Sequence, residues 1–131
     1  MDDVQKSGTP NPNSGRISVF IPVYRDSDLL EELLEGLVND PYENREIFVT
    51  IDEPTAEAYR VVERFRDRVH FILSGQRRGK VEALNEAVKA SIGEILVFLD
   101  ADVKLGECGD FLGKIALEME DTDILDIKKK I

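Results

Sequence analysis

The sequence predicts an α/β domain in which helices cover both faces of an open, mostly parallel sheet. Two observations support this fold class. Short apolar runs rich in β-branched residues alternate along the chain with amphipathic stretches of helical period. The apolar runs are nearly continuous, which is typical of strands that are buried on both faces. Strands that alternate with helices in this way favour a parallel sheet with right-handed crossovers.

Each expected strand is a short apolar run that ends close to polar or turn-forming residues. The first, "ISVFIPV", is followed by "YRDSD", and the fourth, "EILVFL", leads into "DAD". The five expected strands are residues 17–23, 46–52, 69–74, 94–100 and 123–127.

The expected helices lie between these strands and carry apolar residues on one face. They occupy residues 26–40, 54–68, 79–93 and 110–120. In the first of them, Asp28 and Glu31 have the spacing of a capping box, with aspartate in place of the usual Ser or Thr. In the third, we expect Val81, Leu84 and Val88 to point inward.

The length of the chain, 131 residues, is that of one domain with a single core. Residues 1–15 are rich in proline, glycine, serine and asparagine and have almost no apolar residues, so we expect a disordered tail. The folded domain is then expected over residues 16–131.

The formal net charge of −10 argues against nucleic acid as a partner, because no basic surplus is present to neutralise a phosphate backbone. The single cysteine, Cys108, excludes an internal disulfide and suits a reducing compartment. No apolar stretch approaches the ~20 residues of a transmembrane span, and the N-terminus does not resemble a signal peptide. We therefore expect a cytoplasmic location, either free or at the inner face of the membrane.

Polar side chains gather where the expected strands end. The strand ends read "PVYRD", "DEPT", "SGQRRGK" and "DAD". Ligands of open parallel sheets bind beyond the carboxyl ends of the strands, so these segments are expected to form one site. No GxGxxG follows the first strand, and "GQRRGKV" has three residues between its glycines where a P-loop has four, so the common phosphate loops are absent.

The most distinctive of these segments is the pair Asp100 and Asp102. In extended backbone, residues i and i+2 project to the same side about 7 Å apart. Two carboxylates placed in this way suit Mn²⁺ or Mg²⁺, whose remaining positions bind phosphate oxygens. The alternative interpretation is an acidic turn in which one aspartate makes Asx hydrogen bonds.

Three stretches, taken in order and spacing, resemble the nucleotide-sugar-binding half of family 2 glycosyltransferases. They are "ISVFIPVYRDSDLLEELLEGL", "EIFVTIDEPTAE" and "RRGKVEALNEAVKASIGEILVFLDADV", and the resemblance covers roughly residues 16–103. Members of this family are inverting enzymes with the GT-A fold, whose nucleotide-binding half is Rossmann-like. The resemblance implies an incomplete GT-A domain that binds a UDP- or GDP-linked sugar and takes part in transfer to an unknown acceptor.

The resemblance assigns the first two strand ends to the nucleoside. Pro22, Val23 and Tyr24 match the segment that lies against the base. Asp52 and Glu53 match the acidic pair of the family's "VDDGS", which contacts base and ribose. Because this chain has "IDEPT" at that place, the identity of the base stays open.

The resemblance assigns the later segments to the diphosphate and a metal ion. Gly79 and Lys80 match the stretch near the diphosphate, and Asn85 belongs to the same motif, "GKxxALNxA". Asp100 and Asp102 match the DxD pair, of which the first lies near the ribose and the second binds Mn²⁺ or Mg²⁺.

The part of the family domain that supplies the acceptor surface and the catalytic base is not recognisable here. Asp121, Asp123 and Asp126 are candidates for the base only because they are acidic. We therefore expect this chain alone to lack the base and the acceptor site. An open sheet edge is then expected to favour a homodimer or another partner.

Two alternatives remain. One is a non-catalytic module on the same scaffold that binds a nucleotide or another protein. The other is a receiver-like domain with Asp100 as phosphoacceptor, although Asp26 and Asp28 lie too far past the first strand for its acidic pair. In all these interpretations Arg77 and Arg78 are expected to be solvated rather than functional.

Overall fold

The computed structural model describes residues 15–105, 109–119 and 124–127 of the chain. The elements are β1 (Ile17–Tyr24), α1 (Leu30–Val38), β2 (Arg45–Asp52), α2 (Ala56–Phe65), β3 (His70–Ser74), α3 (Lys80–Ala90), β4 (Ile95–Leu99), α4 (Phe111–Glu118) and β5 (Ile124–Ile127). Within these ranges no helix is long and apolar enough to cross a membrane.

Some sequence-based predictions fall outside the described residues. Of the predicted tail, only Gly15 is described, and its N–H donates to Glu94 Oε1 at 2.8 Å. Cys108, Asp121 and Asp123 also lie outside the described residues.

The five strands form one sheet in the order β3-β2-β1-β4-β5. Every neighbouring pair is parallel, which confirms the predicted sheet. Tyr24 of β1 is in register with Asp52 of β2, and Asp52 is in register with Ser74 of β3, so three strands finish level. The strand order reverses at β1, between β2 and β4, and a ligand site is expected at this switch point. The predicted homodimer through a sheet edge stays a prediction.

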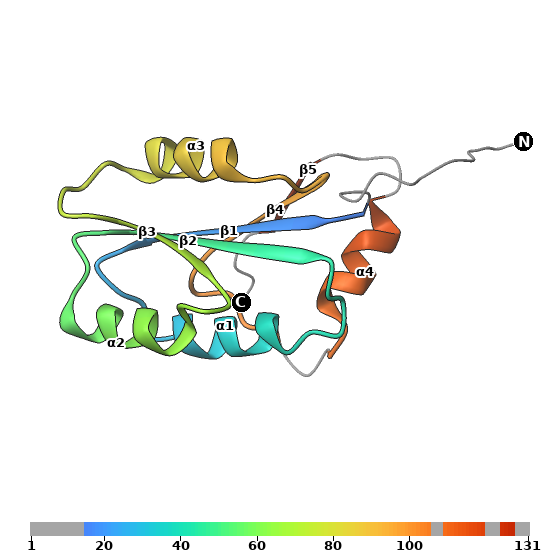
Figure 1. Cartoon of the computed structure of the whole chain (residues 1–131), viewed down its shortest axis with the longest axis horizontal. Coiled ribbons are helices and arrows are strands. Elements are labelled where there is room, and N and C mark those ends of the chain that lie inside the picture. The colour runs from blue at the N-terminus through green and yellow to red at the C-terminus, as the bar shows by residue number, and fades with distance from the viewer. Residues whose placement is uncertain (1–14, 106–108, 120–123, 128–131) are drawn as a thin grey trace, which may run out of the picture.

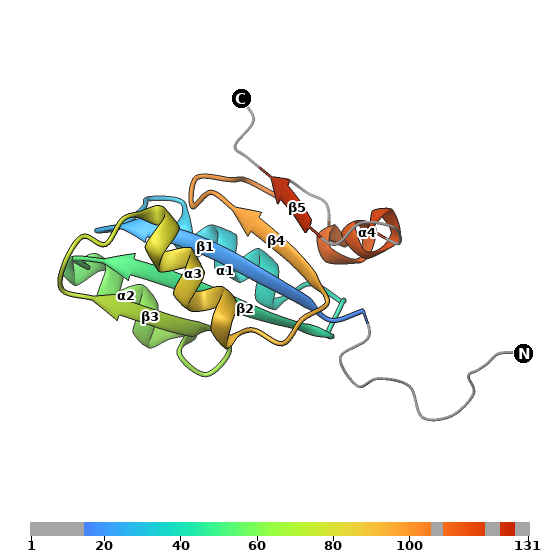
Figure 2. The same cartoon turned by 90° about the horizontal axis from the view of Figure 1, so that it is seen from above.

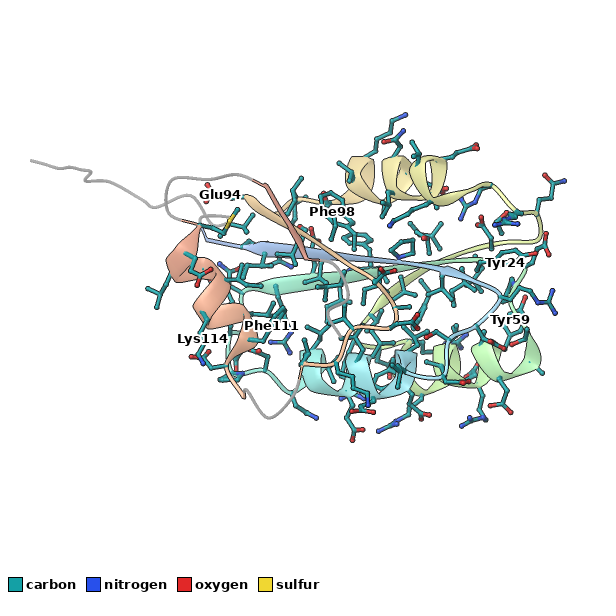
Figure 3. The ribbon with its side chains drawn as sticks, turned by 180° about the vertical axis from the view of Figure 1, so that it is seen from behind. Tyr24, Tyr59, Glu94, Phe98, Phe111 and Lys114 are labelled. Carbon is teal, nitrogen blue, oxygen red and sulfur yellow. The ribbon has the colours of Figure 1, made fainter. Side chains whose placement is uncertain are left out.

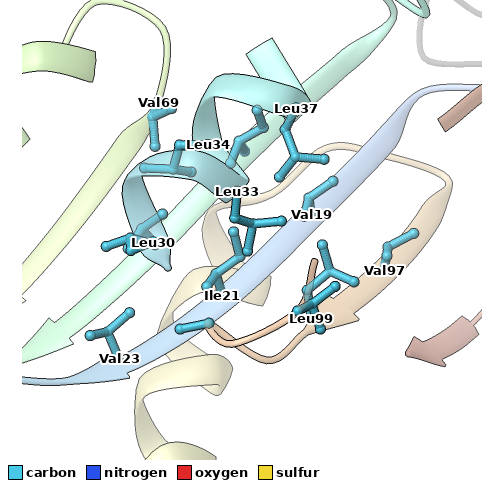
Figure 4. Close-up of a cluster of buried hydrophobic side chains, with 14 of the residues drawn as sticks. Val19, Ile21, Val23, Leu30, Leu33, Leu34, Leu37, Val69, Val97 and Leu99 are labelled. Atoms are coloured by element: carbon cyan, nitrogen blue, oxygen red, sulfur yellow. The ribbon is translucent and has the colours of Figure 1, made fainter. Parts of the chain in front are cut away.

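Helices cover both faces of the sheet, as predicted. Figure 1 shows α1 and α2 on one face and α3 on the other, and Figure 2 shows α3 lying across β1. The larger core lies between the sheet and α1, α2 and α4 (Figure 4). Alternate residues of β1, including Val19, Ile21 and Val23, face this core together with Leu30 and Leu34 of α1.

The layer beneath α3 is thinner and is built on aromatic rings. Phe20 of β1 stacks on Phe48 of β2 with ring centroids 5.6 Å apart, and on Phe98 of β4 at 5.1 Å. Phe20 is fully buried. These rings come from the strand positions that alternate with the larger core, so the period of two divides the side chains between the two layers.

The orientation of α3 differs from the prediction. Ala83 and Ala87 are its buried residues, whereas Leu84 and Val88 pack beside them and are only partly buried. Val81, which we expected to point inward, is 73% exposed, so that prediction is wrong. The two alanines let the helix approach the aromatic layer closely, and this contact, rather than the apolar content of the helix, sets its rotation.

The predicted capping box of the first helix is also wrong. The N-cap position of α1 is Leu29, and no side chain caps it. Instead, Ser27 Oγ accepts the Leu29 N–H at 3.3 Å. Asp28 and Glu31 therefore lack the reciprocal bonds that define a capping box.

A buried polar cluster connects the end of α3 to the start of the sheet. Ser18 Oγ donates to Glu46 Oε2 at 2.6 Å, and the same carboxylate oxygen accepts the Ile92 N–H at 2.6 Å. The Gly93 N–H donates to Ser18 Oγ at 2.9 Å. A Cβ atom on Gly93 would lie 2.2 Å from that hydroxyl and 2.9 Å from the backbone nitrogen of Ser18. Glycine is required here by the close approach of two chain segments.

We predict that Gly93→Ala lowers the free energy of unfolding by about 1–3 kcal/mol, because the added methyl group overpacks this contact. Urea denaturation of both chains measures the difference. Gly75→Ala is the matched control, because a Cβ atom at Gly75 meets nothing within 4 Å. An equal loss of stability in the two variants would contradict the proposed overpacking.

Candidate functional site

A pocket of about 200 Å³ lies at the carboxyl ends of the strands, on the face that carries α3. It brings together most of the site residues that the sequence predicts. The residues that line it are Pro22, Val23, Tyr24, Thr50, Asp52, Arg77, Gly79, Lys80, Ala83 and Asp100. Asn85, Glu53 and Asp102 are not among the lining residues.

The convergence follows from the strand period and the register. Pro22, Thr50 and Asp52 occupy strand positions on the same face as the aromatic layer, and they lie where β1 and β2 end level. The first turn of α3 closes the pocket with Lys80 and Ala83. In Figure 3, Tyr24 lies at the end of the sheet opposite Glu94.

Asp52 is the most strongly held of the predicted site residues and is only 5% exposed. Its Oδ2 accepts the backbone N–H of Arg78 at 2.7 Å and that of Gly79 at 3.1 Å. Its Oδ1 accepts Arg78 Nε–H at 3.0 Å. Burial by itself raises the pKa of the Asp52 carboxyl, but the hydrogen bonds from Arg78 and Gly79 and the guanidinium charge outweigh it, so the pKa lies below its ordinary value.

Arg78 is not the solvated residue that we predicted. Its side chain is 16% exposed, and its Nη1 donates to Glu86 of α3. Its Nη2 is buried and has no hydrogen-bond partner among the described residues. Arg78 and Asp52 are 26 positions apart in the sequence, so no local pattern indicates the pair.

The rim of the pocket is formed by a second group of charged and aromatic side chains. The Arg77 guanidinium lies over the Tyr24 ring, 4.2 Å from its centroid. The Tyr24 hydroxyl donates to Glu53 Oε1 at 3.3 Å, and Arg25 Nη1 lies 3.7 Å from the same oxygen. Glu53 therefore contacts the rim rather than the interior of the pocket.

Two residues of this rim have a left-handed backbone conformation, which residues other than glycine seldom adopt. The φ angle is 69° at Arg25 and 53° at Glu53. These residues directly follow β1 and β2, and Arg25 N–H donates to the Asp52 carbonyl at 2.8 Å. Strained backbone concentrates at functional sites, so its position at two adjacent strand ends supports the assignment of the site here.

The segment that contains Asp100 and Asp102 does not have the extended conformation that we expected. β4 ends at Leu99, and the Val103 N–H donates to the Asp100 carbonyl at 3.1 Å, which closes a turn. Asp100 lines the pocket, whereas Asp102 is exposed and its Oδ1 accepts the Ser27 hydroxyl at 3.1 Å. The observed backbone conformation at Asp100 and Asp102 is therefore a turn, which was the alternative to the extended segment.

The donor chemistry of this turn fits a divalent cation. No group of three or more His, Cys, Asp or Glu side chains within the described ranges is arranged to hold a metal ion. Mg²⁺ and similar ions are often held by one or two carboxylates, with substrate phosphates and water as the other ligands. Asp100 and Asp102 are carboxylates of this kind, but only Asp100 lines the pocket, and Asp102 is bonded to Ser27.

Ser27 is a site residue that the sequence reasoning missed. It precedes α1, and its hydroxyl lies 3.1 Å from Asp102 Oδ1 and 3.4 Å from the Ala101 carbonyl. Its distance from Asp102 along the chain, 75 positions, leaves no local signal. Only the parallel packing of β1 beside β4 brings the two segments together.

The model of the family described as "Glycosyl transferase family 2" matches residues 18–124. The chain belongs to glycosyltransferase family 2. This confirms the family resemblance and leaves the receiver-like alternative without support. Poly(ribitol-phosphate) beta-glucosyltransferase of Bacillus spizizenii is 31% identical over 108 residues, which are 78% of this chain and 16% of that protein.

Solved structures show the same fold as this family 2 chain. The mannosyltransferase PcManGT from Pyrobaculum calidifontis, in complex with GDP-Man and Mn²⁺, superposes with a TM-score of 0.69 at 26% identity, over 81% of this chain and 32% of that one. TarS 1-349 of S. aureus, in complex with UDP-GlcNAc, gives 0.66 at 25% identity, over 80% of this chain and 31% of that one. The chain thus spans about a third of each of these structures, and the predicted Rossmann-like GT-A half is confirmed.

We predict that Asp52→Asn destabilises the fold by about 1–3 kcal/mol at neutral pH, because the Arg78 guanidinium loses its buried partner and keeps only the exposed Glu86. The pH dependence follows from the lowered pKa of Asp52. The ionised Asp52 carboxylate contributes its full stabilisation of the fold at pH values above its ordinary pKa of 3.8. This stabilisation is lost as the pH falls through the lower pKa of the folded state. In this acidic window the wild type should lose up to about 1.4 kcal/mol per pH unit more than the variant.

Urea denaturation at a series of pH values measures both effects. Glu57→Gln is the control, because Glu57 is an exposed carboxylate that pairs with Arg60 on the surface of α2. We expect this control to leave the neutral-pH stability nearly unchanged. If the free energy of unfolding falls equally steeply with acidification in the wild type and in Asp52→Asn, Asp52 is not the titrating group.

Proposed function

We propose that these residues bind the nucleotide-sugar donor of an inverting glycosyl transfer. The observation that carries the proposal is a pocket at the switch point of the sheet, where Asp52, Lys80 and Asp100 converge from three different segments. Family membership and two solved relatives that hold GDP-Man and UDP-GlcNAc support the ligand class.

In this proposal the nucleoside occupies the part of the pocket between β1 and β2. Pro22, Val23 and Tyr24 lie against the base, and Asp52 and Glu53 serve the base and ribose. The exposed ring of Tyr24, which is 44% accessible, supports the stacking role. Arg77 covers a face of this ring, so a base stacks either opposite the guanidinium or in its place.

The diphosphate is assigned to the side of the pocket formed by the start of α3. Gly79 is the N-cap residue of α3, and Lys80 begins the helix and lines the pocket. A lysine and a helix N-terminus both favour an anion at this position. Asn85 lies further along α3, so we assign it to the support of this helix rather than to ligand contact.

The metal ion, Mn²⁺ or Mg²⁺, is assigned to Asp100 and Asp102. When bound, it would neutralise negative charge on the diphosphate and so favour its departure as the leaving group. PcManGT was solved with Mn²⁺, which supports a divalent ion in this family. Ser27 would then orient Asp102 through its hydrogen bond to Oδ1.

The transfer itself needs more than the donor pocket. An acceptor hydroxyl attacks the anomeric carbon of the sugar, the bond to the nucleoside diphosphate breaks, and a base accepts the hydroxyl proton. We identify no such base among the described residues. Because the chain spans about a third of its solved relatives, we assign donor binding to these residues and leave the acceptor and the base unassigned.

We predict that the chain binds UDP or GDP in the presence of Mn²⁺ and that Asp102→Ala weakens this binding by about tenfold or more. Titration calorimetry with and without EDTA measures the affinity and its metal dependence. Asp67→Ala is the control, because it removes an exposed carboxylate that follows α2. Failure of UDP and GDP to bind under any metal condition would refute the proposed function.

We also predict that Tyr24→Ala weakens nucleotide binding by about 1–3 kcal/mol, the usual contribution of a base stacked on an aromatic ring. Tyr59→Ala is the matched control, because Tyr59 is similarly exposed, at 51%, and does not line the pocket. Equal affinities of the two variants, measured by the same titration, would place the base elsewhere.

A further inference from the structure

We propose that two copies of this chain form a weak homodimer through α3. The contact is made by three apolar residues, Val81, Leu84 and Val88, which we call the α3 stripe. The two helices pack antiparallel about a two-fold axis, so that the stripe of one copy lies against the stripe of the other. None of these residues lines the donor pocket, so the inference does not depend on the proposed function.

The α3 stripe has the spacing of an apolar helix face, but the core of this chain does not use it as one. Its residues recur at positions i, i+3 and i+7, which places them on one side of the helix. Val81 is 73% exposed, and Leu84 and Val88 are only partly buried. The helix is buried instead through Ala83 and Ala87. Contiguous apolar surface that a fold leaves exposed marks a site of interaction with another molecule.

The stripe lies on the flank of α3 that faces β4. The opposite flank is fixed by Glu86, which is bonded to Arg78, and Arg78 in turn binds Asp52 at the end of β2. Each residue of a helix is rotated by about 100° from the one before it, so Glu86 and Val88 lie on opposite sides of the buried Ala87. Because β1 separates β2 from β4 in the sheet, the flank opposite Glu86 points toward β4.

The apolar surface continues from the stripe onto β4. Leu96 and Phe98 alternate along this strand with the residues of the larger core, and both are only partly buried. Phe98 lies on the α3 side of the sheet, where it stacks on Phe20 (Figure 3). Of the described helices, none lies over β4 on this face (Figure 2). The stripe and these two side chains therefore border one uncovered apolar surface.

The charges beside the stripe match a second copy of the same helix. Glu82 lies in the first turn of α3 and Lys89 in the last turn, and both are exposed. They are seven residues apart, about two turns, so they project from the same flank. In an antiparallel pair the first turn of one helix lies beside the last turn of the other. Each Glu82 therefore meets a Lys89, and the two-fold axis makes this pair twice.

A second copy fits this surface better than a membrane does. The chain has a formal net charge of −10, and Glu82 borders the stripe, so an anionic lipid surface would repel it. The helix has 11 residues, so the contact is small and belongs to the size range of transient interfaces. We therefore expect a dissociation constant of about 10–100 µM for the homodimer.

Sedimentation equilibrium over a range of protein concentrations measures this constant. Val81→Arg should weaken dimerisation by about tenfold or more, because it places a charge without a partner in the centre of the contact. Leu117→Arg is the matched control, because Leu117 is 72% exposed and lies on α4, which packs in the larger core. This control should leave dimerisation unchanged. A wild type that stays monomeric up to about tenfold above the expected constant, or an equal effect of the two variants, would overturn the inference.

A charge exchange tests the antiparallel arrangement and separates it from a change in folding. Glu82→Lys and Lys89→Glu should each weaken the homodimer by about threefold or more, because like charges then meet twice. In an equimolar mixture of the two variants, each introduced side chain faces an opposite charge on the other chain. The mixture should therefore associate about as tightly as the wild type. A mixture that associates no better than the single variants would overturn the arrangement.

Vesicles of phosphatidylcholine and phosphatidylglycerol test the membrane as the other occupant of the surface. We expect the wild type to remain in the supernatant when these vesicles are pelleted, because both surfaces are negatively charged. Vesicle binding by a chain that forms no dimer in solution would assign the α3 stripe to a lipid surface and overturn the proposed homodimer.

Discussion

The Asp52 carboxylate is the point on which the site depends. It is buried at the end of β2, and a buried charge of this kind is costly unless donors surround it. The loop before α3 supplies those donors from the backbone of Arg78 and Gly79 and from the Arg78 side chain. The same contacts that neutralise the charge therefore place Gly79 and Lys80 beside the strand ends, where the pocket forms.

The two faces of the sheet differ, because one holds the larger core and the other carries the pocket. The face under α1, α2 and α4 holds the larger apolar core. The face under α3 is shallower, because Ala83 and Ala87 allow the helix to lie close to the aromatic layer. At the carboxyl end of that layer the strand positions carry Thr50 and Asp52 instead of rings, and a pocket occupies the space. Membership of glycosyltransferase family 2 gives that pocket its chemical context.

The acidic turn after β4 lies at the same edge of the sheet, but its hydrogen bond comes from the segment before α1 rather than from the loop before α3. Ser27, at the start of α1, bonds to Asp102, while Asp100 faces the pocket beneath α3. The strained residues Arg25 and Glu53 follow β1 and β2 at the same edge of the sheet. Contacts from both helical layers thus meet where β1 and β4 diverge, which is the usual position of ligands in open parallel sheets.

The sequence by itself determined the order of strands and helices, the parallel sheet and the edge that carries the site, because these follow from local hydrophobic period and from the residues that end each strand. Only the tertiary structure decided how individual side chains are used. The pairing of Arg78 with Asp52, the contact of Ser27 with Asp102 and the outward position of Val81 each depend on segments that are distant in sequence or on helix rotation against the sheet. Local pattern contains no information on such contacts, since they are set by packing between elements.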